Sequence, residues 1–227
     1  MDMGNDESMT LAAKAPDERR RRILAASIVV LRERGFSGTR VADIAATAGT
    51  SPALVLYHFS SLADVLVASL ESIEDDYYAE LATHADDDPR DRLATIGTLN
   101  AEVGPAFGDW KLWLEVWVRG LHDERIDQLR RASDERWREA IRDVIDAGMK
   151  QGIFTVDNPD GTTLRIASLQ DGLAVQAVLG GAGLTPASMA YEWLIGVAHE
   201  LGIDPVDLTG RADAMQASTP PMTAEDA

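Results

Sequence analysis

The chain has 227 residues, 45% of them hydrophobic, no cysteine and a formal net charge of −17. This length and apolar content are typical of one large or two modest globular domains. The absence of cysteine excludes disulfides, thiolate catalysis and zinc–thiolate sites. No apolar run approaches the roughly 18 residues of a membrane span, and the amino terminus lacks the order of a secretory signal. We therefore expect a soluble cytoplasmic protein without membrane contact.

The amino-terminal end begins with a polar stretch and continues as a helix. Residues 1–16 are small and polar, so we expect a disordered tail. An apolar series at helical spacing follows a block of four arginines. This first helix is expected to end at Gly35, because glycine suits the left-handed conformation that terminates helices.

A second and a third short helix are predicted directly after the first. Thr39 is expected to cap the second helix, over residues 40–48. Gly49 provides a turn, and Ser51 then caps a third helix that has Pro52 at its first position. The segment therefore predicts a helix, a turn and a helix.

Charge is distributed unevenly along the chain. Residues 17–62 hold seven arginines and four acids, whereas residues 63–227 hold 13 basic and 31 acidic side chains. Affinity for DNA depends on cations that replace counterions at phosphates, so the arginine-rich segment is the part suited to nucleic acid. A solvated helix start is the alternative for the arginine block, although arginines in a first turn oppose the helix dipole.

The rest of the chain is helical in pattern. A capping box at Ser61 and Asp64 starts a long helix, Pro89 opens another, and Gly104 and Pro105 break it. Four further helices are expected over 108–121, 124–151, 161–179 and 187–201. About nine helices without a strand predict an all-α protein.

The helices divide into two expected domains. We expect a helix-turn-helix DNA-binding domain over residues 17–63 and a larger helical domain over residues 64–203. Residues 204–227 are small, polar and proline-bearing, and we expect a second disordered tail there.

The DNA-binding assignment is strengthened by a family resemblance. Four motifs occur in order: ERGF at 33–36, Thr39 followed by Ile44 and Ala45, AGTS at 48–51, and YHF at 57–59. Over about residues 17–70 the chain resembles the amino-terminal domain of the TetR family of bacterial transcriptional regulators. In that family the second and third helices form the reading unit, and the third lies in the major groove.

The resemblance implies double-stranded DNA as a partner, in the form of a palindromic operator. The positions carried over to the groove are Thr50, Ser51, Pro52, Ala53, Leu54 and Tyr57, with Arg22, Thr39, Arg40 and His58 beside them or at phosphates. Ala53 and Leu54 are expected to meet thymine methyl groups, and Tyr57 a phosphate or a base edge. Val55 and Phe59 are expected in the core.

Two positions depart from the family's usual pattern. Leu56 stands where many relatives have a tyrosine, and Leu62 stands where a lysine commonly opens the fourth helix. Both changes remove phosphate contacts, and they support the alternative that the chain is a protein-binding adaptor on the same fold. An enzyme is not expected, because the four histidines are scattered and no metal-binding spacing appears. No cofactor or metal is therefore predicted.

The last two predicted helices are apolar on more than one face and need cover on two sides. In the TetR family the corresponding helices pair across a twofold axis, which implies a homodimer with its recognition helices about one DNA turn apart. The alternative is that they form the centre of a single domain. The residues expected at the interface are Leu169, Leu173, Val178, Met189, Trp193 and Val197.

Tryptophans mark a candidate effector site. Trp110, Trp113 and Trp117 share one helical face, Trp137 comes from the next helix, and Asp171 interrupts an apolar segment. Such a stripe is also typical of core packing, and a hydrogen bond within the protein is the alternative for the carboxylate. If these residues line a cavity, tryptophan faces and a carboxylate suit a cationic amine.

The body of the chain is similar to the carboxy-terminal domains of the BetI-like branch of TetR regulators. The motifs are W-x-x-W at 110–113, Trp137, GIF at 152–154 and DG at 171–172. Some members of that branch respond to choline-like or polyamine ligands. Together the two resemblances imply a ligand-responsive regulator, a homodimeric repressor that a small molecule releases from its operator.

Overall fold

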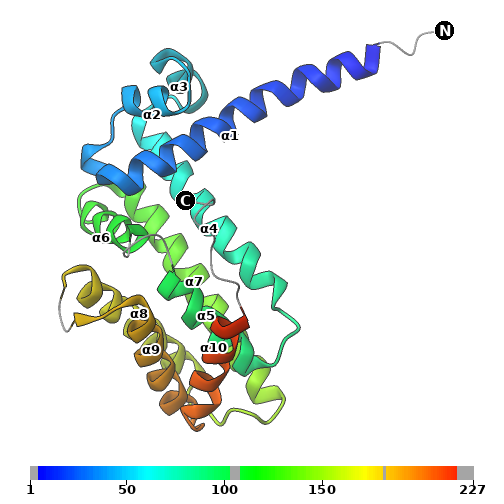
Figure 1. Ribbon diagram of the computed structural model, residues 1–227, viewed down its shortest axis with the longest axis vertical. Helices are drawn as coiled ribbons and strands as arrows, with labels where there is room; N and C mark the ends of the chain where they lie inside the picture. Colours follow the sequence, from blue (N-terminus) through cyan, green and yellow to red (C-terminus); the bar gives the residue numbers. More distant parts are fainter. Residues whose placement is uncertain (1–4, 103–107, 181–182, 219–227) are drawn as a thin grey trace. The chain divides into compact units, whose positions relative to one another are not determined.

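The computed structural model describes residues 5–102, 108–180 and 183–218, and over these residues it contains ten helices (Figure 1). They are α1 (Asn5–Gly38), α2 (Val41–Thr47), α3 (Pro52–Phe59), α4 (Leu62–Thr83), α5 (Pro89–Glu102), α6 (Gly108–Gly120), α7 (Glu124–Lys150), α8 (Pro159–Val178), α9 (Pro186–Leu201) and α10 (Val206–Ser218). The all-α prediction is confirmed, with one helix more than expected. The break predicted at Gly104 and Pro105 lies outside the described residues.

The chain forms two compact units that divide between Asp76 and Tyr77, within α4. None of the helices described is by itself long and apolar enough to cross a membrane. Helices α3 and α4 taken together, with a bend of 69° between them, have the length and composition of such a span.

The first unit packs α1 to α3 and the start of α4 around one small core. Ile23, Val30, Ile44, Val55 and Phe59 are buried there, each from an apolar position at helical spacing. The backbone of α1 leaves helical geometry at the predicted stop, Gly35, which has a φ of 68°. The predicted inward positions of Val55 and Phe59 are confirmed.

The amino-terminal end differs from the expected disordered tail. α1 begins at Asn5, so the expectation for residues 1–16 is wrong from Asn5 onward. Residues 11–15 read LAAKA, a run of strong helix formers, and the helix continues from them through Pro16 to the arginine block. Residues 1–4 lie outside the described part of the chain.

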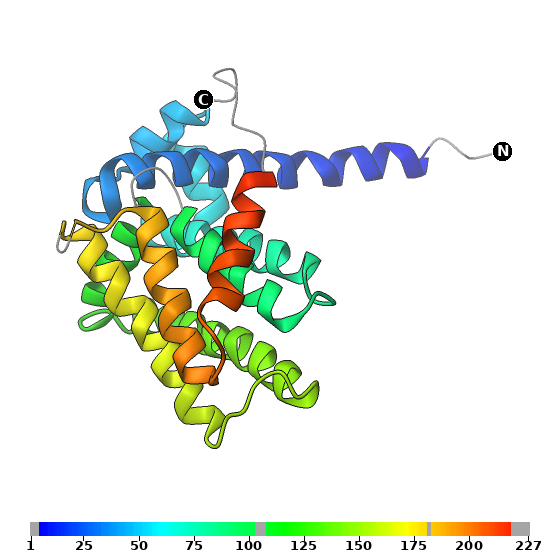
Figure 2. The ribbon, with the colours of Figure 1, turned by 60° about the horizontal axis from the view of Figure 1, so that its bottom comes forward.

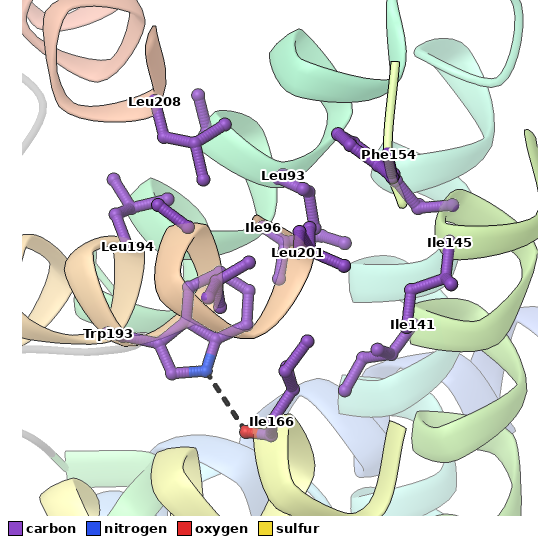
Figure 3. Close-up of a cluster of buried hydrophobic side chains, with 14 of the residues drawn as sticks. Leu93, Ile96, Ile141, Ile145, Phe154, Ile166, Trp193, Leu194, Leu201 and Leu208 are labelled. Atoms are coloured by element: carbon purple, nitrogen blue, oxygen red, sulfur yellow. Dashed lines mark hydrogen bonds between the residues drawn. The ribbon is translucent and has the colours of Figure 1, made fainter. Parts of the chain in front are cut away.

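The second unit has a core built around Trp193 of α9 (Figure 3). Its ring is fully buried, and its Nε1 donates a hydrogen bond to the carbonyl of Ile166 on α8 at 3.3 Å. Leu93 of α5 and Ile141 of α7 close the same cluster. Helices α8 and α9 lie side by side (Figures 1 and 2). This core fixes α7 against α8, the two helices that carry the acids of the pocket described below.

The carboxy-terminal end is not the expected disordered tail over most of residues 204–227. α10 packs on α5 and α9, and it buries Leu208 and Ala212 in the main core. Asp204 starts the helix by accepting a hydrogen bond from the amide of Val206 at 3.0 Å, and Arg211 pairs with Asp91 of α5. The spacing of the two buried residues is helical, but many small and polar residues around them obscured this pattern.

One glycine in this core has no room for a side chain. A Cβ at Gly148 of α7 would overlap the buried ring of Phe154. Replacing Gly148 by alanine is therefore expected to destabilise the protein by about 2 kcal/mol, measured by urea unfolding. The control is Gly210→Ala, because a Cβ at this exposed position in α10 meets nothing within 4 Å. That change is expected to be neutral or stabilising by up to about 1 kcal/mol, and equal effects of the two changes would contradict the prediction.

Candidate functional sites

The third helix is built by local sequence signals. Gly49 turns the chain with a φ of 62°, and the Ser51 side chain accepts a hydrogen bond from the amide of Leu54 at 3.2 Å, which confirms the predicted cap. Pro52 occupies the first turn. Because only Val55 and Phe59 turn fully inward, the opposite face of α3 is left at the surface.

The outward face of α3 holds most of the predicted groove residues. Ser51, Pro52, Ala53 and Leu56 are exposed, and Tyr57 is 80% exposed. Leu56 was not among the predicted residues, and three that were predicted, Thr50, Leu54 and His58, are half-buried. The Tyr57 ring meets the ring of His58 edge to face, with 5.3 Å between their centroids. The face is therefore mainly apolar, with an aromatic hydroxyl that reaches solvent.

Thr39 and Arg22 hold the unit together at two turns. Thr39 is buried and its hydroxyl donates to the carbonyl of Gly35 at 2.7 Å, so the expectation that it caps α2 is wrong. Arg40 takes the N-cap position without a side-chain cap, and its side chain is exposed. Arg22 donates from Nη2 to the carbonyl of Ala48 at 3.1 Å, which ties α1 to the end of α2.

Other arginines of α1 also have partners inside the unit. Arg20 lies over the ring of Phe59, with 4.8 Å from its guanidinium carbon to the ring centroid. Arg21 pairs with Glu18, and Arg34 pairs with Asp43 at 2.9 Å. Contacts within the unit thus hold these arginine side chains in place. Sequence patterns did not reveal the contacts of Arg20 and Arg34, because their partners lie on other helices.

The two departures from the family pattern have different surroundings. Leu56 is 41% exposed on the outer face of α3, beside Tyr57. Leu62, at the start of α4, is half-buried and packs against the core of the first unit. Leu62 therefore has a packing role that a lysine in its place would fill only with its aliphatic stem.

A pocket of about 570 Å³ lies in the second unit, where α6, α7 and α8 meet. Its apolar wall comes from Trp117 and Leu121 of α6, and its polar wall comes mainly from the start of α7. Asp171 reaches it from α8. The residues that line it are Trp117, Gly120, Leu121, Asp127, Arg130, Arg131, Asp134 and Asp171.

Asp171 is the most perturbed acid of this pocket. Its pKa is raised to about 6, chiefly by burial and also by the nearby carboxylate of Asp134, while Arg138 opposes the rise. Burial also raises the pKa of Asp134, against the lowering effects of Arg130 and Arg138. A buried carboxylate with a raised pKa is one that lacks sufficient positive partners, which suits a site for a cation.

The four predicted tryptophans do not share one environment. Trp117 lines the pocket together with Asp171. Trp110 donates from Nε1 to the carbonyl of Asn100 at 3.0 Å, and it packs against a cluster formed by α8 and α9. Trp137 packs on the main core, with 6.5 Å between its ring centroid and that of Trp193. Trp113 is half-buried and is not among the residues that line the pocket.

Sequence reasoning missed the polar wall of the pocket. Asp127, Arg130, Arg131 and Asp134 are spaced three and four residues apart on α7, and they bond to one another. The spacing itself was visible in the sequence as a set of helical ion pairs. That these pairs face Asp171 became visible only when α7 and α8 were packed together.

The residues expected at a dimer interface divide into two groups. Met189, Trp193 and Val197 are buried within the chain itself, so their assignment to the interface is wrong: Met189 packs against α8, and Trp193 and Val197 lie in the main core with residues of α5 and α8. Leu169, Leu173 and Val178 are half-buried. The large apolar side chains that α8 and α9 expose are Leu164, Leu179 and Tyr191.

Both units match models of known protein families. Residues 23–68 match the model of bacterial regulatory proteins of the tetR family, and residues 89–194 match the model of the BetI-type transcriptional repressor carboxy-terminal domain. Among curated proteins, the chain is 30% identical over 122 residues to the HTH-type transcriptional regulator BetI of Stenotrophomonas maltophilia. That match covers 52% of this chain and 62% of the relative, so less than two thirds of the relative's length is spanned.

Solved structures of similar chains agree with this match. A transcriptional regulator from Saccharomonospora viridis, solved in complex with choline, is 30% identical with a TM-score of 0.73, and the match covers 82% of this chain and 98% of the other. A TetR-family transcriptional regulator from Rhodococcus is 26% identical with a TM-score of 0.71, over 82% and 99% of the two chains.

Proposed function

The chain belongs to the TetR family of bacterial regulatory proteins and carries a BetI-type carboxy-terminal domain, and on that premise we propose that it is a ligand-responsive, homodimeric transcriptional repressor. Membership of this family places it among regulators rather than enzymes. The proposal joins three functions: reading of a palindromic operator, pairing of two copies, and release by a small cation.

The exposed face of α3 is the observation that carries operator reading. A short helix held by two buried side chains, Val55 and Phe59, presents an apolar and aromatic face to solvent on a rigid unit. This is the arrangement that a helix-turn-helix needs to place its second helix in a major groove. Exposed Arg40 lies at the start of α2, where phosphates flank such a helix.

A mobility-shift assay with the region upstream of the gene and its neighbours tests operator reading. We expect a complex that footprinting resolves into two protected half-sites about one DNA turn apart, weakened by added salt. If no twofold-symmetric site is protected at low salt and without effector, the chain does not act as an operator-binding repressor.

The dimer is proposed to form through α8 and α9, by their exposed rather than their buried residues. Leu164 of α8, Leu179 at the C-cap of α8 and Tyr191 of α9 are 56%, 72% and 50% exposed, so these two helices offer apolar surface to a partner. A Cβ at Gly172, on the same helix as Leu164, meets nothing within 4 Å, so a partner helix could approach closely there. A twofold axis would bring these residues of one subunit against the same residues of the other.

Charge placed in this patch is expected to separate the subunits. The double change Leu164→Glu and Leu179→Glu should weaken the dimer at least about 100-fold, because each copy would bury unpaired carboxylates at the interface. Native mass spectrometry measures the ratio of monomer to dimer. The matched control is Val206→Glu, which adds a charge at an exposed apolar position of α10 and should leave the dimer intact. An unchanged dimer in the double variant would overturn this assignment.

The effector is proposed to be a small cationic amine, with a quaternary ammonium such as choline as the first candidate. Trp117 and Asp171 supply an aromatic face and a carboxylate in one pocket, and these groups attract a desolvated cation by about 1 to 2 kcal/mol or more. The similar Saccharomonospora viridis regulator was solved with choline. Thermal-shift measurements with choline, betaine and polyamines provide the test. Stabilisation by neutral or acidic compounds alone would exclude a cationic effector.

Release from the operator requires two states of the dimer. The effector must bind the state with the wrong half-site spacing more tightly than the DNA-binding state, because equal affinity shifts no equilibrium. By linkage, operator DNA must then weaken effector binding by the same factor. Titration of the effector with and without operator measures this factor.

A further inference from the structure

The effector pocket already contains a cation of the protein itself. The guanidinium of Arg130 donates from Nε and Nη2 to Oδ1 of Asp127, at 3.0 and 2.7 Å, and from Nη1 to Oδ2 of Asp134, at 2.5 Å. All three side chains line the pocket with Trp117 and Asp171. Arg130 is three-quarters buried. Its positive charge therefore lies where the ammonium group of a cationic effector would bind.

We propose that Arg130 competes with the effector for the carboxylate of Asp134. An incoming cation replaces the guanidinium of Arg130 at Asp134, while Arg130 keeps its hydrogen bonds to Asp127. This inference rests on the proposed function, because it concerns the same pocket and the same class of ligand. It assigns to Arg130 a positioning role that sets the affinity and selectivity of the site. A cation must compensate for the lost Arg130–Asp134 pair before it gains any net affinity.

The geometry indicates which carboxylate is released. In a helix, an ion pair is more stabilising when the acid lies on the amino-terminal side of the base. Asp127 precedes Arg130 and has this favourable order, whereas Asp134 follows Arg130 and forms the weaker pair. Asp127 also holds Arg131, at 2.7 Å. Asp134 has the fewer close partners, and burial raises its pKa, so its charge is incompletely compensated.

Replacing Arg130 by a cation at Asp134 is expected to disturb the packing of the helices little. Asp127, Arg130 and Asp134 all belong to α7, so breaking one of their bonds separates no pair of helices. Trp117 faces the same space from α6, and Asp171 faces it from α8. A cation at Asp134 would thus have an aromatic face and a second carboxylate beside it.

The test compares choline affinity in three forms of the full-length protein by isothermal titration calorimetry at pH 7.5. Arg130→Gln should bind choline at least about tenfold more tightly than the unmodified chain, because Asp134 no longer has to be vacated. Arg142→Gln is the matched control: Arg142 pairs with Asp146 four residues later on the same helix at 2.8 Å and also with Asp160 of α8, and it lies outside the pocket. It removes the same charge and should change affinity less than about threefold.

A double-mutant cycle locates the exchange at Asp134. In an Asp134→Asn background, Arg130→Gln should no longer raise choline affinity, because the contested carboxylate is gone. A gain from Arg130→Gln no larger than that from Arg142→Gln overturns the inference, even when choline binds and the proposed function stands. Choline binding that appears only in Arg130→Gln supports it. Binding to none of the variants overturns both the inference and a choline-type effector, while operator reading is tested separately by DNA binding.

Discussion

Replacing Tyr57 by alanine is expected to lower operator affinity at least about 100-fold. The side chain is 80% exposed on the outer face of α3, so its loss removes the proposed DNA contact and no core packing. A hydrogen bond to a charged group contributes about 1.5 kcal/mol or more, and a dimer loses one in each half-site, so the combined loss of about 3 kcal/mol corresponds to roughly 100-fold. The measurement is a mobility-shift titration at fixed salt.

Two controls separate DNA contact from other effects. Tyr57→Phe keeps the ring and removes the hydroxyl, so it distinguishes hydrogen bonding from aromatic contact. The thermal unfolding temperature and the oligomeric state seen by native mass spectrometry should be unchanged in both variants, because Tyr57 is not part of the core. A combined change of Tyr57 and Arg40 to alanine also tests the adaptor alternative. If these residues can be replaced without loss of operator binding, α3 does not read the DNA as proposed.

Replacing Asp171 by asparagine is expected to have two opposite effects. Affinity for a cationic effector should fall about 100-fold, because a partly desolvated carboxylate is lost from the pocket. Without effector, the variant should be more stable at pH 7 by about 2 kcal/mol, after discounting for the side chain's partial exposure, because the buried charge no longer has to be accommodated. Calorimetry measures the first effect, and urea unfolding measures the second.

The dependence on pH follows from the sign of the shift. The folded-state pKa of Asp171 is about 6, above the usual value of 3.8, so the folded chain holds this proton more tightly than the unfolded chain. The contribution of this group to stability is complete below about pH 4 and declines as pH rises to about 6. Cation affinity should change in the opposite direction and rise through pH 6. Burial and the carboxylate of Asp134 raise this pKa, and the guanidinium of Arg138 lowers it.

The matched control for charge is Asp143→Asn. Asp143 is an exposed acid on α7 that does not line the pocket, so its loss changes the net charge without changing the site. Affinity and its pH dependence should stay as in the unmodified chain. Retention of cation affinity within about threefold in Asp171→Asn, or the same loss in Asp143→Asn, would contradict the role proposed for Asp171.

Much of the first unit could be predicted, because the residues that start and end its helices are close together in the sequence. Gly49, Ser51 and Pro52 define a turn, a cap and a first helical position within four residues, and helical spacing separates buried Val55 from exposed Tyr57. Thr39 was the exception: a cap was predicted, but its hydroxyl bonds back to Gly35 instead. A hydroxyl near a helix start has several carbonyls and amides within reach, and only the path of the turn selects one.

The amino-acid sequence by itself determined the number and type of most helices, the family, and the outward face of α3. Only the tertiary structure decided that Met189 and Trp193 belong to the chain's own core while Leu164 and Leu179 remain exposed, and that Asp171 of α8 meets Asp134 and Arg130 of α7 in one pocket. The physical reason is that helical periodicity identifies an apolar face, whereas which surface covers it, and which charges become neighbours, depends on contacts between residues far apart in the chain.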